Sequence, residues 1–100
     1  MKIKILPAAQ ADLIDIGDYI ALDNPERALS FIAEIEELIF AQIAIRPNSF
    51  PLRADLAADL RVARHRRYLV FFTYESGSIQ IVRVLHGARD IPNALEADRA

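Results

Sequence analysis

Residues 67–90, RYLVFFTYESGSIQIVRVLHGARD, decide the fold that this sequence predicts. Within them, the run 68–74 has six apolar or aromatic residues in seven, and the run 79–85 has five apolar residues in seven. Both runs have the length and the β-branched or aromatic content of strands. Between them, Gly77 supplies the positive φ that a tight connection commonly needs. The stretch therefore predicts an antiparallel hairpin, and residues 86–90 place polar and charged groups just past its end.

The chain before this hairpin predicts one strand and two helices. Residues 2–6 alternate polar and apolar side chains, which is typical of a short strand, and a proline ends it. From residue 8 to about residue 21, apolar residues recur every three or four positions, which predicts a helix with one apolar face. Asn24 and Pro25 suit the N-cap and first turn of a second helix, which should extend to about residue 45. So short a link requires the two helices to form an antiparallel hairpin.

The segments around the central hairpin complete the predicted topology. Residues 46–51 contain two prolines and should form a loop. For residues 52–59 the sequence allows either a helical turn or irregular structure. Residues 60–65 alternate and predict a strand, and the tail, residues 91–100, could hold a short helix. The predicted order is β-α-α-β-β-β, an α+β fold with the helical hairpin packed on one face of a small antiparallel sheet. Arginines and aromatic residues should line the other, partly open face.

The composition predicts a single domain spanning residues 1–100. A chain of 100 residues that is 53% hydrophobic and 26% charged can bury one core and little more. The absence of cysteine excludes disulfides and thiolate metal sites and is consistent with a reducing cytosol. No apolar run approaches the ~20 residues that a bilayer requires, and the two histidines are too distant in the sequence to suggest a metal site. We therefore expect a soluble, cytoplasmic protein with no membrane contact, no metal and no cofactor.

The two halves of the chain carry opposite charge. Residues 1–52 have eight acidic and four basic residues, a net charge of −4, whereas residues 53–90 have four acidic and seven basic residues, a net charge of +3. All seven of these bases are arginine, whose planar guanidinium suits carboxylate or phosphate. The asymmetry indicates an anionic partner for the C-terminal half. Alternatively, arginines that flank an edge strand serve to prevent association between sheets.

Several single residues have both a functional and a structural interpretation. His86 could act as a general acid or base, or it could hold a backbone group at the strand end. Arg89 and Asp90 could contact a partner, or Asp90 could cap the turn that follows. Arg83 lies within a strand and is expected to be paired and partly buried. The remaining expectations place Asp12, Asp15 and Asp18 in solvent, Tyr19 and Phe31 in the core, His65 at the surface and Phe50 as an anchor of its loop.

Four segments, taken in order, resemble a known protein family. They are LIDIGDYIA at residues 13–21, DNP at 23–25, RYLVFF at 67–72 and RVLHGARD at 83–90, of which the last is the most specific. Together they are similar to the ParE branch of the RelE/ParE toxins of bacterial type II toxin–antitoxin systems, from about residue 3 to residue 91. The resemblance implies the fold predicted above. It also implies a cognate antitoxin, ParD-like or of another class, which wraps the toxin across the helical hairpin and sheet in a hetero-oligomer.

The resemblance implies alternative activities. RelE-like members cut mRNA in the ribosomal A site with sheet arginines and a C-terminal tyrosine or histidine, whereas ParE-like members are associated with inhibition of DNA gyrase. One arginine position of the nucleases falls on Tyr68, a second falls on Arg89, and the tyrosine position falls near Leu95, so two of the three depart from the nuclease pattern. The leading interpretation is therefore a gyrase inhibitor without catalytic residues. A ribosome-dependent mRNA endonuclease using Arg89 and His86 is the second, and a degenerate toxin that only binds its antitoxin is the third.

The residues expected to contact the antitoxin or the target lie in the basic C-terminal half. Their guanidinium, phenol and carboxylate groups suit polar contacts with another macromolecule. We expect no sequence-specific DNA binding by the toxin alone. The predicted binding residues are Arg61, Arg64, Arg66, Arg67, Tyr68, Arg89 and Asp90.

Overall fold

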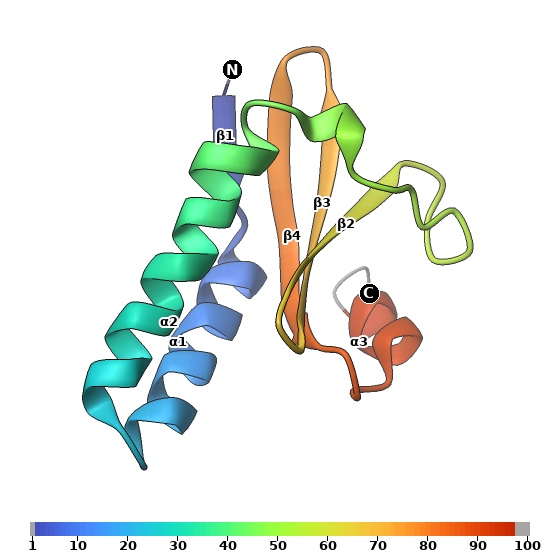
Figure 1. Cartoon of the computed structure of the whole chain (residues 1–100). Coiled ribbons are helices and arrows are strands. Elements are labelled where there is room, and N and C mark those ends of the chain that lie inside the picture. Colours follow the sequence, from blue (N-terminus) through green and yellow to red (C-terminus); the bar gives the residue numbers. More distant parts are fainter. Residues whose placement is uncertain (1, 98–100) are drawn as a thin grey trace.

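The fold is a helical hairpin packed on one face of a four-stranded sheet, with a short helix on the other face (Figure 1). The structure is a computed structural model and describes residues 2–97. The α+β class and the predicted β-α-α-β-β-β order are confirmed, and a C-terminal helix follows them. The elements are β1 (Lys2–Ile5), α1 (Pro7–Ala21), α2 (Pro25–Glu37), the π-helical segment η1 (Leu38–Ile43), the 3-10 turn η2 (Pro47–Ser49), β2 (Leu60–His65), β3 (Tyr68–Glu75), β4 (Ser78–His86) and α3 (Ile91–Ala97).

The sheet is mixed, with the strand order β1-β4-β3-β2. β2, β3 and β4 pair antiparallel, but β1 pairs parallel with β4, for example Ile3 with Ile79. The prediction of a wholly antiparallel sheet is wrong at this strand. An alternating sequence pattern indicates which side chains point to each face of a strand, but it does not indicate the direction of the neighbouring strand. The central hairpin is confirmed, and its turn residues Ser76 and Gly77 have φ of 50° and 77°. Positive φ at both positions matches the twist of the flanking strands.

The two long helices start and pack as the sequence predicts. The side chain of Asn24 accepts a hydrogen bond from the Arg27 N–H at 3.1 Å, which caps α2. A Cβ at Gly17 would lie 3.5 Å from Cγ1 of Ile32, so α1 and α2 approach closely there. α2 continues into η1, whose wider turns include a hydrogen bond from the Ala44 N–H to the Ile39 carbonyl at 3.0 Å. The second helical stretch thus ends near the predicted position, but its last turns are not α-helical.

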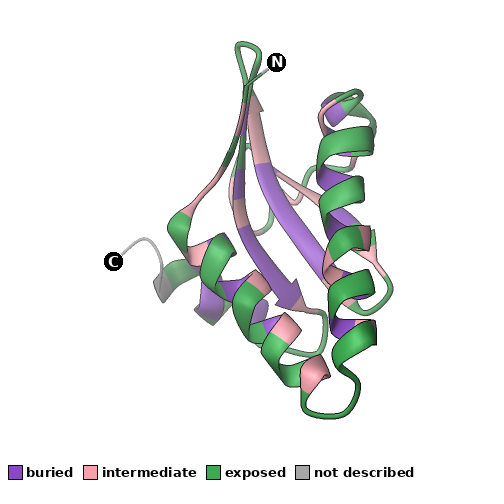
Figure 2. Cartoon of the chain, turned by 90° about the vertical axis from the view of Figure 1, so that its left-hand side faces the viewer, coloured by how far each residue is buried: buried purple, intermediate pink, exposed green. Residues whose placement is uncertain are grey.

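The larger core lies between the helical hairpin and the sheet. Figure 2 shows buried stretches along the strands and exposed stretches over most of the long helices. Phe31 is buried in this core, as predicted. Phe50 packs edge-on against Phe72, with ring centroids 5.8 Å apart, so it anchors its loop. The fully buried residues of this core are Ala9, Ile35, Ile39, Ile43, Val70, Phe72, Ile79 and Ile81.

The second face of the sheet is covered, so the expectation of an open face lined by arginines and aromatic residues is wrong. α3 packs on this face, and Leu56 and Ala57 of the loop between η2 and β2 also pack against it. Ile91, Ala94 and Leu95 fall at helical spacing and form the buried side of α3. The other buried members of this second cluster are Leu60, Leu69, Phe71 and Leu85.

A buried ion pair joins α1, β4 and α3. Nε and Nη2 of Arg83 donate to the two carboxylate oxygens of Asp12 at 2.7 and 2.8 Å, and Nη1 donates to the Ala94 carbonyl at 3.1 Å. Asp12 also accepts the Val84 N–H at 2.9 Å, on the edge of β4 beyond the last residue of β1. The expectation for Arg83 is confirmed. The expectation that Asp12 is solvated is wrong, because its position relative to β4, and not its place on the helix stripe, decides its burial. Within residues 2–97, no helix has the length and hydropathy needed to span a membrane.

Candidate functional site

An open groove of about 630 Å³ lies at the end of the sheet where the β2–β3 turn meets the end of β4. It is the same end of the molecule at which α1 leads into α2 (Figure 1). One wall comes from the two long helices and the other from the turn and the strand ends. We call it the arginine–aromatic groove, after its lining residues Tyr19, Phe31, Arg66, Arg67, Tyr68 and His86.

The turn that carries both arginines is held tightly in place. Arg66 and Arg67 are the two residues between β2 and β3, and Arg66 has a φ of 54°, a left-handed conformation that is unfavourable for a long side chain. The Gly87 N–H donates to the Arg67 carbonyl at 2.7 Å. A Cβ at Gly87 would lie 3.3 Å from that oxygen, so the close approach favours glycine. The backbone of the arginine turn is therefore tied to the end of β4.

Aromatic rings in edge-to-face contact line the groove. The Phe31 and Tyr68 rings meet edge-to-face with centroids 5.5 Å apart, and the Tyr68 and His86 rings meet at 5.2 Å. Burial raises the pKa of the Tyr68 phenol, with a smaller contribution from Tyr19. The hydroxyl of Tyr68 therefore stays protonated at neutral pH and can donate a hydrogen bond.

Beside the groove, Glu34 is fully engaged by basic side chains. Its carboxylate accepts hydrogen bonds from Arg27, and from Nε2 of His65 at 2.7 Å, while Nε of Arg66 lies 3.8 Å away. The hydrogen bonds from Arg27 and then His65 lower the pKa of Glu34 to about 2. The expectation that His65 is simply a surface residue is wrong, because its ring is half-buried between Glu34 and Phe31. Glu34 is thus a poor base and remains charged throughout the neutral range.

His86 has a defined hydrogen bond at the strand end. Its Nδ1 accepts the Ala88 N–H at 3.0 Å, so the neutral ring carries its proton on Nε2. This is the structural role that the sequence suggested as one of two alternatives. Nε2–H remains a donor, and the two arginines and the phenol of Tyr68 are donors as well. The side chains that line the groove therefore offer several donors and no free base.

The other predicted binding residues are dispersed. Arg64 is exposed, and its Nη1 lies 3.4 Å from the Arg66 carbonyl, next to the groove. Arg61 lies at the opposite end of β2, where its guanidinium donates to the Phe50 carbonyl at 2.7 Å and supports the proline-containing loop. Arg89 is exposed just beyond His86. Asp90 caps α3, accepting the Asn93 N–H at 3.5 Å and the Asn93 side-chain amide at 2.8 Å.

Sequence reasoning missed three contributors to this region. Tyr19 was expected in the core, but it is 72% exposed and lines the groove. Tyr19 lies three positions after Ile16, which belongs to the apolar face of α1, but in the next turn Ile20, and not Tyr19, packs against the core. Arg27 and Glu34 are separated by seven residues on α2, a spacing that brings side chains to one helix face and that could have indicated their pairing.

A second groove, of about 600 Å³, runs along the outer side of the helical hairpin. Large apolar side chains are exposed at or beside it: Ile14 is 63%, Leu22 87% and Leu29 77% exposed. Asp18 and Glu36 are its charged members. We call it the hairpin groove; its lining residues are Leu13, Ile14, Gly17, Asp18, Ala21, Pro25, Ala28, Leu29, Ile32 and Glu36.

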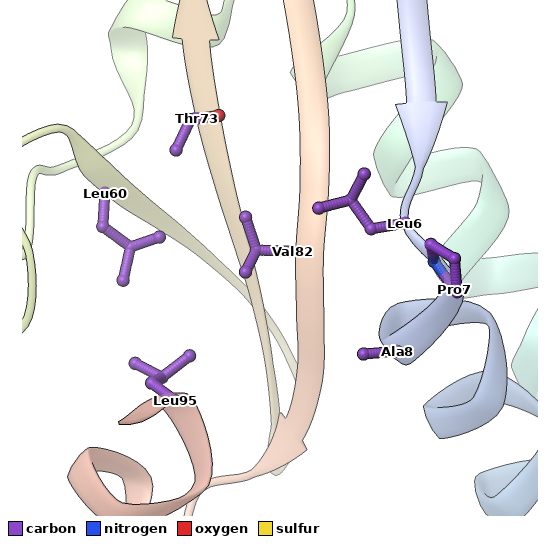
Figure 3. A pocket seen from close by; sticks show the side chains of 7 residues that line it. All are labelled: Leu6, Pro7, Ala8, Leu60, Thr73, Val82 and Leu95. Atoms are coloured by element: carbon purple, nitrogen blue, oxygen red, sulfur yellow. The ribbon is translucent and has the colours of Figure 1, made fainter. Parts of the chain in front are cut away.

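A third cavity is largely apolar and lies beside α3. Figure 3 shows the side chains around its approximately 400 Å³, which come from the β1–α1 connection, the strands and α3. Thr73 is the one polar side chain among them, so the cavity has no evident chemistry. Leu95, where the nuclease tyrosine position falls, is one of its lining residues and is buried. In the described part of the chain, no cluster of three His, Asp or Glu side chains could hold a metal ion.

A helical hairpin on a small mixed sheet, with a basic groove at one end and an apolar groove along the outer side of the hairpin, defines a small α+β protein. The family described as ParE toxin of type II toxin–antitoxin system, parDE, matches residues 3–91, and the chain belongs to that family. A solved chain of the chromosomal ParDE TA system from P. aeruginosa is 27% identical, with a TM-score of 0.73, over 86% of this chain and 95% of that one. The comparison with curated proteins found no match. The predicted family is confirmed, and a ParDE system implies a cognate ParD antitoxin as partner.

Proposed function

We propose that this ParE toxin arrests replication by binding DNA gyrase and breaks no bond of its own. The observation that supports this proposal best is the arginine–aromatic groove, which presents donors and cations without a base. Such a groove suits recognition of an anionic surface more than proton transfer.

Metal-free cleavage of RNA needs more than this groove offers. A base must take the 2′-hydroxyl proton, cations must stabilise the phosphorane, and an acid must protonate the leaving oxygen. The arginines and the Nε2–H of His86 could serve the last two steps. The nearby carboxylate of Glu34 has a pKa of about 2, and Leu95 has no proton to exchange. These features favour binding over catalysis.

A supercoiling assay tests the proposal directly. Purified full-length toxin, added to gyrase, relaxed plasmid and ATP, should reduce supercoiling or trap cleaved DNA. Toxin that is first mixed with an excess of its antitoxin is the control and should leave supercoiling intact. Normal supercoiling at saturating toxin would count against gyrase as the target.

One observation favours the mRNA endonuclease as a second candidate. Arg66, Arg67, Tyr68 and His86 lie in one groove, and residues of these types can together support phosphodiester cleavage. Primer extension on translated mRNA separates the two functions. The gyrase proposal predicts no toxin-dependent cuts, whereas an endonuclease would produce cuts that His86→Ala abolishes. If the toxin neither cuts mRNA nor slows growth in cells without antitoxin, it is a degenerate member that only binds its partner.

We further propose that the ParD antitoxin occupies the hairpin groove. The groove is predominantly apolar and exposes Ile14 and Leu29, while Asp18 and Glu36 supply negative charge. An amphipathic antitoxin segment with apolar anchors and flanking basic residues is complementary to it. The variant Leu29→Glu should weaken antitoxin binding about 100-fold or more, since it places a charge among apolar contacts.

A matched variant controls for charge and helix position in this binding test. Ala33 lies on the same helix, is exposed and does not line the hairpin groove, so Ala33→Glu should bind the antitoxin as the unchanged toxin does. Both variants alter exposed positions and should melt within a few degrees of the unchanged toxin. Equal antitoxin affinity of the Leu29 and Ala33 variants would exclude the groove as the docking site.

A further inference from the structure

The arginine–aromatic groove has the polarity of an anion-binding site. Its polar side chains are the guanidinium groups of Arg66 and Arg67, the hydroxyls of Tyr19 and Tyr68 and the imidazole of His86, whose free Nε2 carries a proton. Each of these groups can donate a hydrogen bond, and two are permanent cations. Among residues 2–97, no carboxylate side chain lines the groove.

The positive charge of the groove is only partly compensated within the protein. Glu34 is the carboxylate closest to Arg66, at 3.8 Å, but Arg27 and His65 already bond to both of its oxygens. Among residues 2–97, Arg67 forms no ion pair. Exposed Arg64 reaches the Arg66 carbonyl, and the N–H of exposed Arg89 bonds to the His86 carbonyl at the end of β4, so both residues add to the local positive potential.

The backbone holds these arginines in place before any ligand binds. Arg66 adopts a φ of 54°, which is costly for a non-glycine residue and is common where structure serves function. The Gly87 N–H bonds to the Arg67 carbonyl at 2.7 Å and joins the turn to the strand end that carries His86. A fixed turn reduces the backbone entropy that would otherwise be lost when the two arginines bind a ligand.

The combination of cations with aromatic rings favours nucleic acid over an acidic peptide. Tyr19 is 72% exposed and lines the groove together with the half-buried rings of Tyr68 and His86. Surfaces that combine basic side chains with exposed rings bind phosphates along the backbone and stack bases. A groove of about 630 Å³ is also larger than a single carboxylate requires.

We therefore propose that the arginine–aromatic groove binds the phosphodiester backbone of the DNA segment on which gyrase acts. This inference rests on the proposed function and names the DNA, rather than gyrase protein alone, as a direct contact of the toxin. The contact is with phosphates and base faces, so it has no sequence preference.

The test measures DNA binding by full-length toxin with fluorescein-labelled 20-mers, single-stranded and duplex, by anisotropy at several salt concentrations. The double variant Arg66→Gly/Arg67→Ala removes both guanidinium groups, and glycine suits the positive φ of the turn. The control Lys4→Ala/Arg46→Ala removes the same charge from exposed positions at the opposite end of the sheet. Poly-glutamate serves as a competitor of matched charge.

Unchanged toxin and control should bind DNA, with affinity that falls as salt rises. The double variant should bind roughly 100-fold more weakly and show a salt slope reduced by about 1.5, as expected for two lost phosphate contacts. The inference is wrong if the double variant and the control bind DNA equally, if unchanged toxin binds no DNA at low salt, or if poly-glutamate competes as well as unlabelled DNA.

The same proteins in the supercoiling assay separate this inference from the proposed function. Inhibition by unchanged toxin and control, together with its loss in the double variant, supports both. If the double variant inhibits gyrase as strongly as the control does, the groove is not used and the inference fails while gyrase inhibition stands. If unchanged toxin binds DNA through the groove but never inhibits gyrase, the proposed target is wrong while the DNA site stands.

Discussion

The substitution Asp12→Ala should be the most destabilising single change on α1. Asp12 is 7% exposed and accepts three hydrogen bonds, two from Arg83 and one from the Val84 N–H. Alanine removes the carboxylate that accepts two hydrogen bonds from the buried guanidinium, and breaking such a pair costs about 3–5 kcal/mol in comparable sites. The Val84 N–H also loses its acceptor, which costs about 1–3 kcal/mol more when no water replaces it. Because Arg83 keeps its bond to the Ala94 carbonyl, we expect a total of about 4–6 kcal/mol.

Urea denaturation followed by circular dichroism measures this loss as a fall in the free energy of unfolding. A domain of this size is stable by only about 5–15 kcal/mol, so Asp12→Ala approaches the threshold of unfolding. Asp12→Asn retains an acceptor for Val84 and should cost less, about 3 kcal/mol, which keeps the test measurable. Asp15→Ala, at an exposed position on the same helix, is the control and should change stability by less than about 0.5 kcal/mol.

A second variant identifies the reason for the loss. In Asp12→Leu/Arg83→Met both charges are replaced by apolar side chains of similar size, so no buried charge lacks its partner. This double variant should recover at least about 2 kcal/mol relative to Asp12→Ala. A loss below about 1 kcal/mol in Asp12→Ala, or a double variant no more stable than the single one, would refute the ion-pair argument.

Three further predictions concern the region of the arginine–aromatic groove. The pKa of Glu34 falls from 4.5 to about 2 on folding, so its carboxylate stabilises the fold above pH 4.5 and loses that effect as the pH falls towards 2. Glu34→Gln should therefore flatten the plot of unfolding free energy against pH between these values. Equal slopes for the variant and the unchanged protein would contradict the pairing of Glu34 with Arg27 and His65. Arg66→Gly should raise the melting temperature, by a net gain of about 0.5–1 kcal/mol, because it relieves the left-handed backbone; a lower melting temperature would show that the side chain contributes more than the strain costs. Gly87→Ala should cost about 1 kcal/mol in thermal unfolding because its Cβ would press on the Arg67 carbonyl from 3.3 Å; no change would mean that the turn moves freely.

The fold could be predicted from the sequence wherever a local pattern determines the local structure. The alternating strands, the N-cap at Asn24 and the turn at Gly77 are of this kind, and all are present. The parallel pairing of β1 and the closure of the second face by α3 could not be predicted in this way. Both depend on which segments meet across the whole chain, and single-segment periodicity contains no such information.

The candidate site was partly predictable for the same reason. Arg66, Arg67 and Tyr68 are adjacent in the sequence, so a prediction based on charge and on the start of the strand named them together, and the structure places them in one groove. Tyr19, which comes from the other end of the chain, joins them only through packing of α1 on the sheet. Arg61 was grouped with them by charge alone, yet its guanidinium is bound to the Phe50 carbonyl at the opposite end of β2. Charge along a sequence indicates a class of partner, but strand geometry decides which charges can act together.

The segment RVLHGARD, residues 83–90, shows why a specific family match does not by itself name a target. Arg83 pairs with Asp12, Val84 packs in the core under the long helices, and Leu85 packs in the core under α3. His86 lines the groove, and Gly87 leaves room for the Arg67 carbonyl. Its last residue caps α3. Most of the segment is therefore explained by its role in folding, so a match to this segment indicates a shared fold more than a shared target. We therefore expect selectivity for a target to depend chiefly on exposed residues outside this segment, and our proposal assigns that role to the β2–β3 turn and Tyr19.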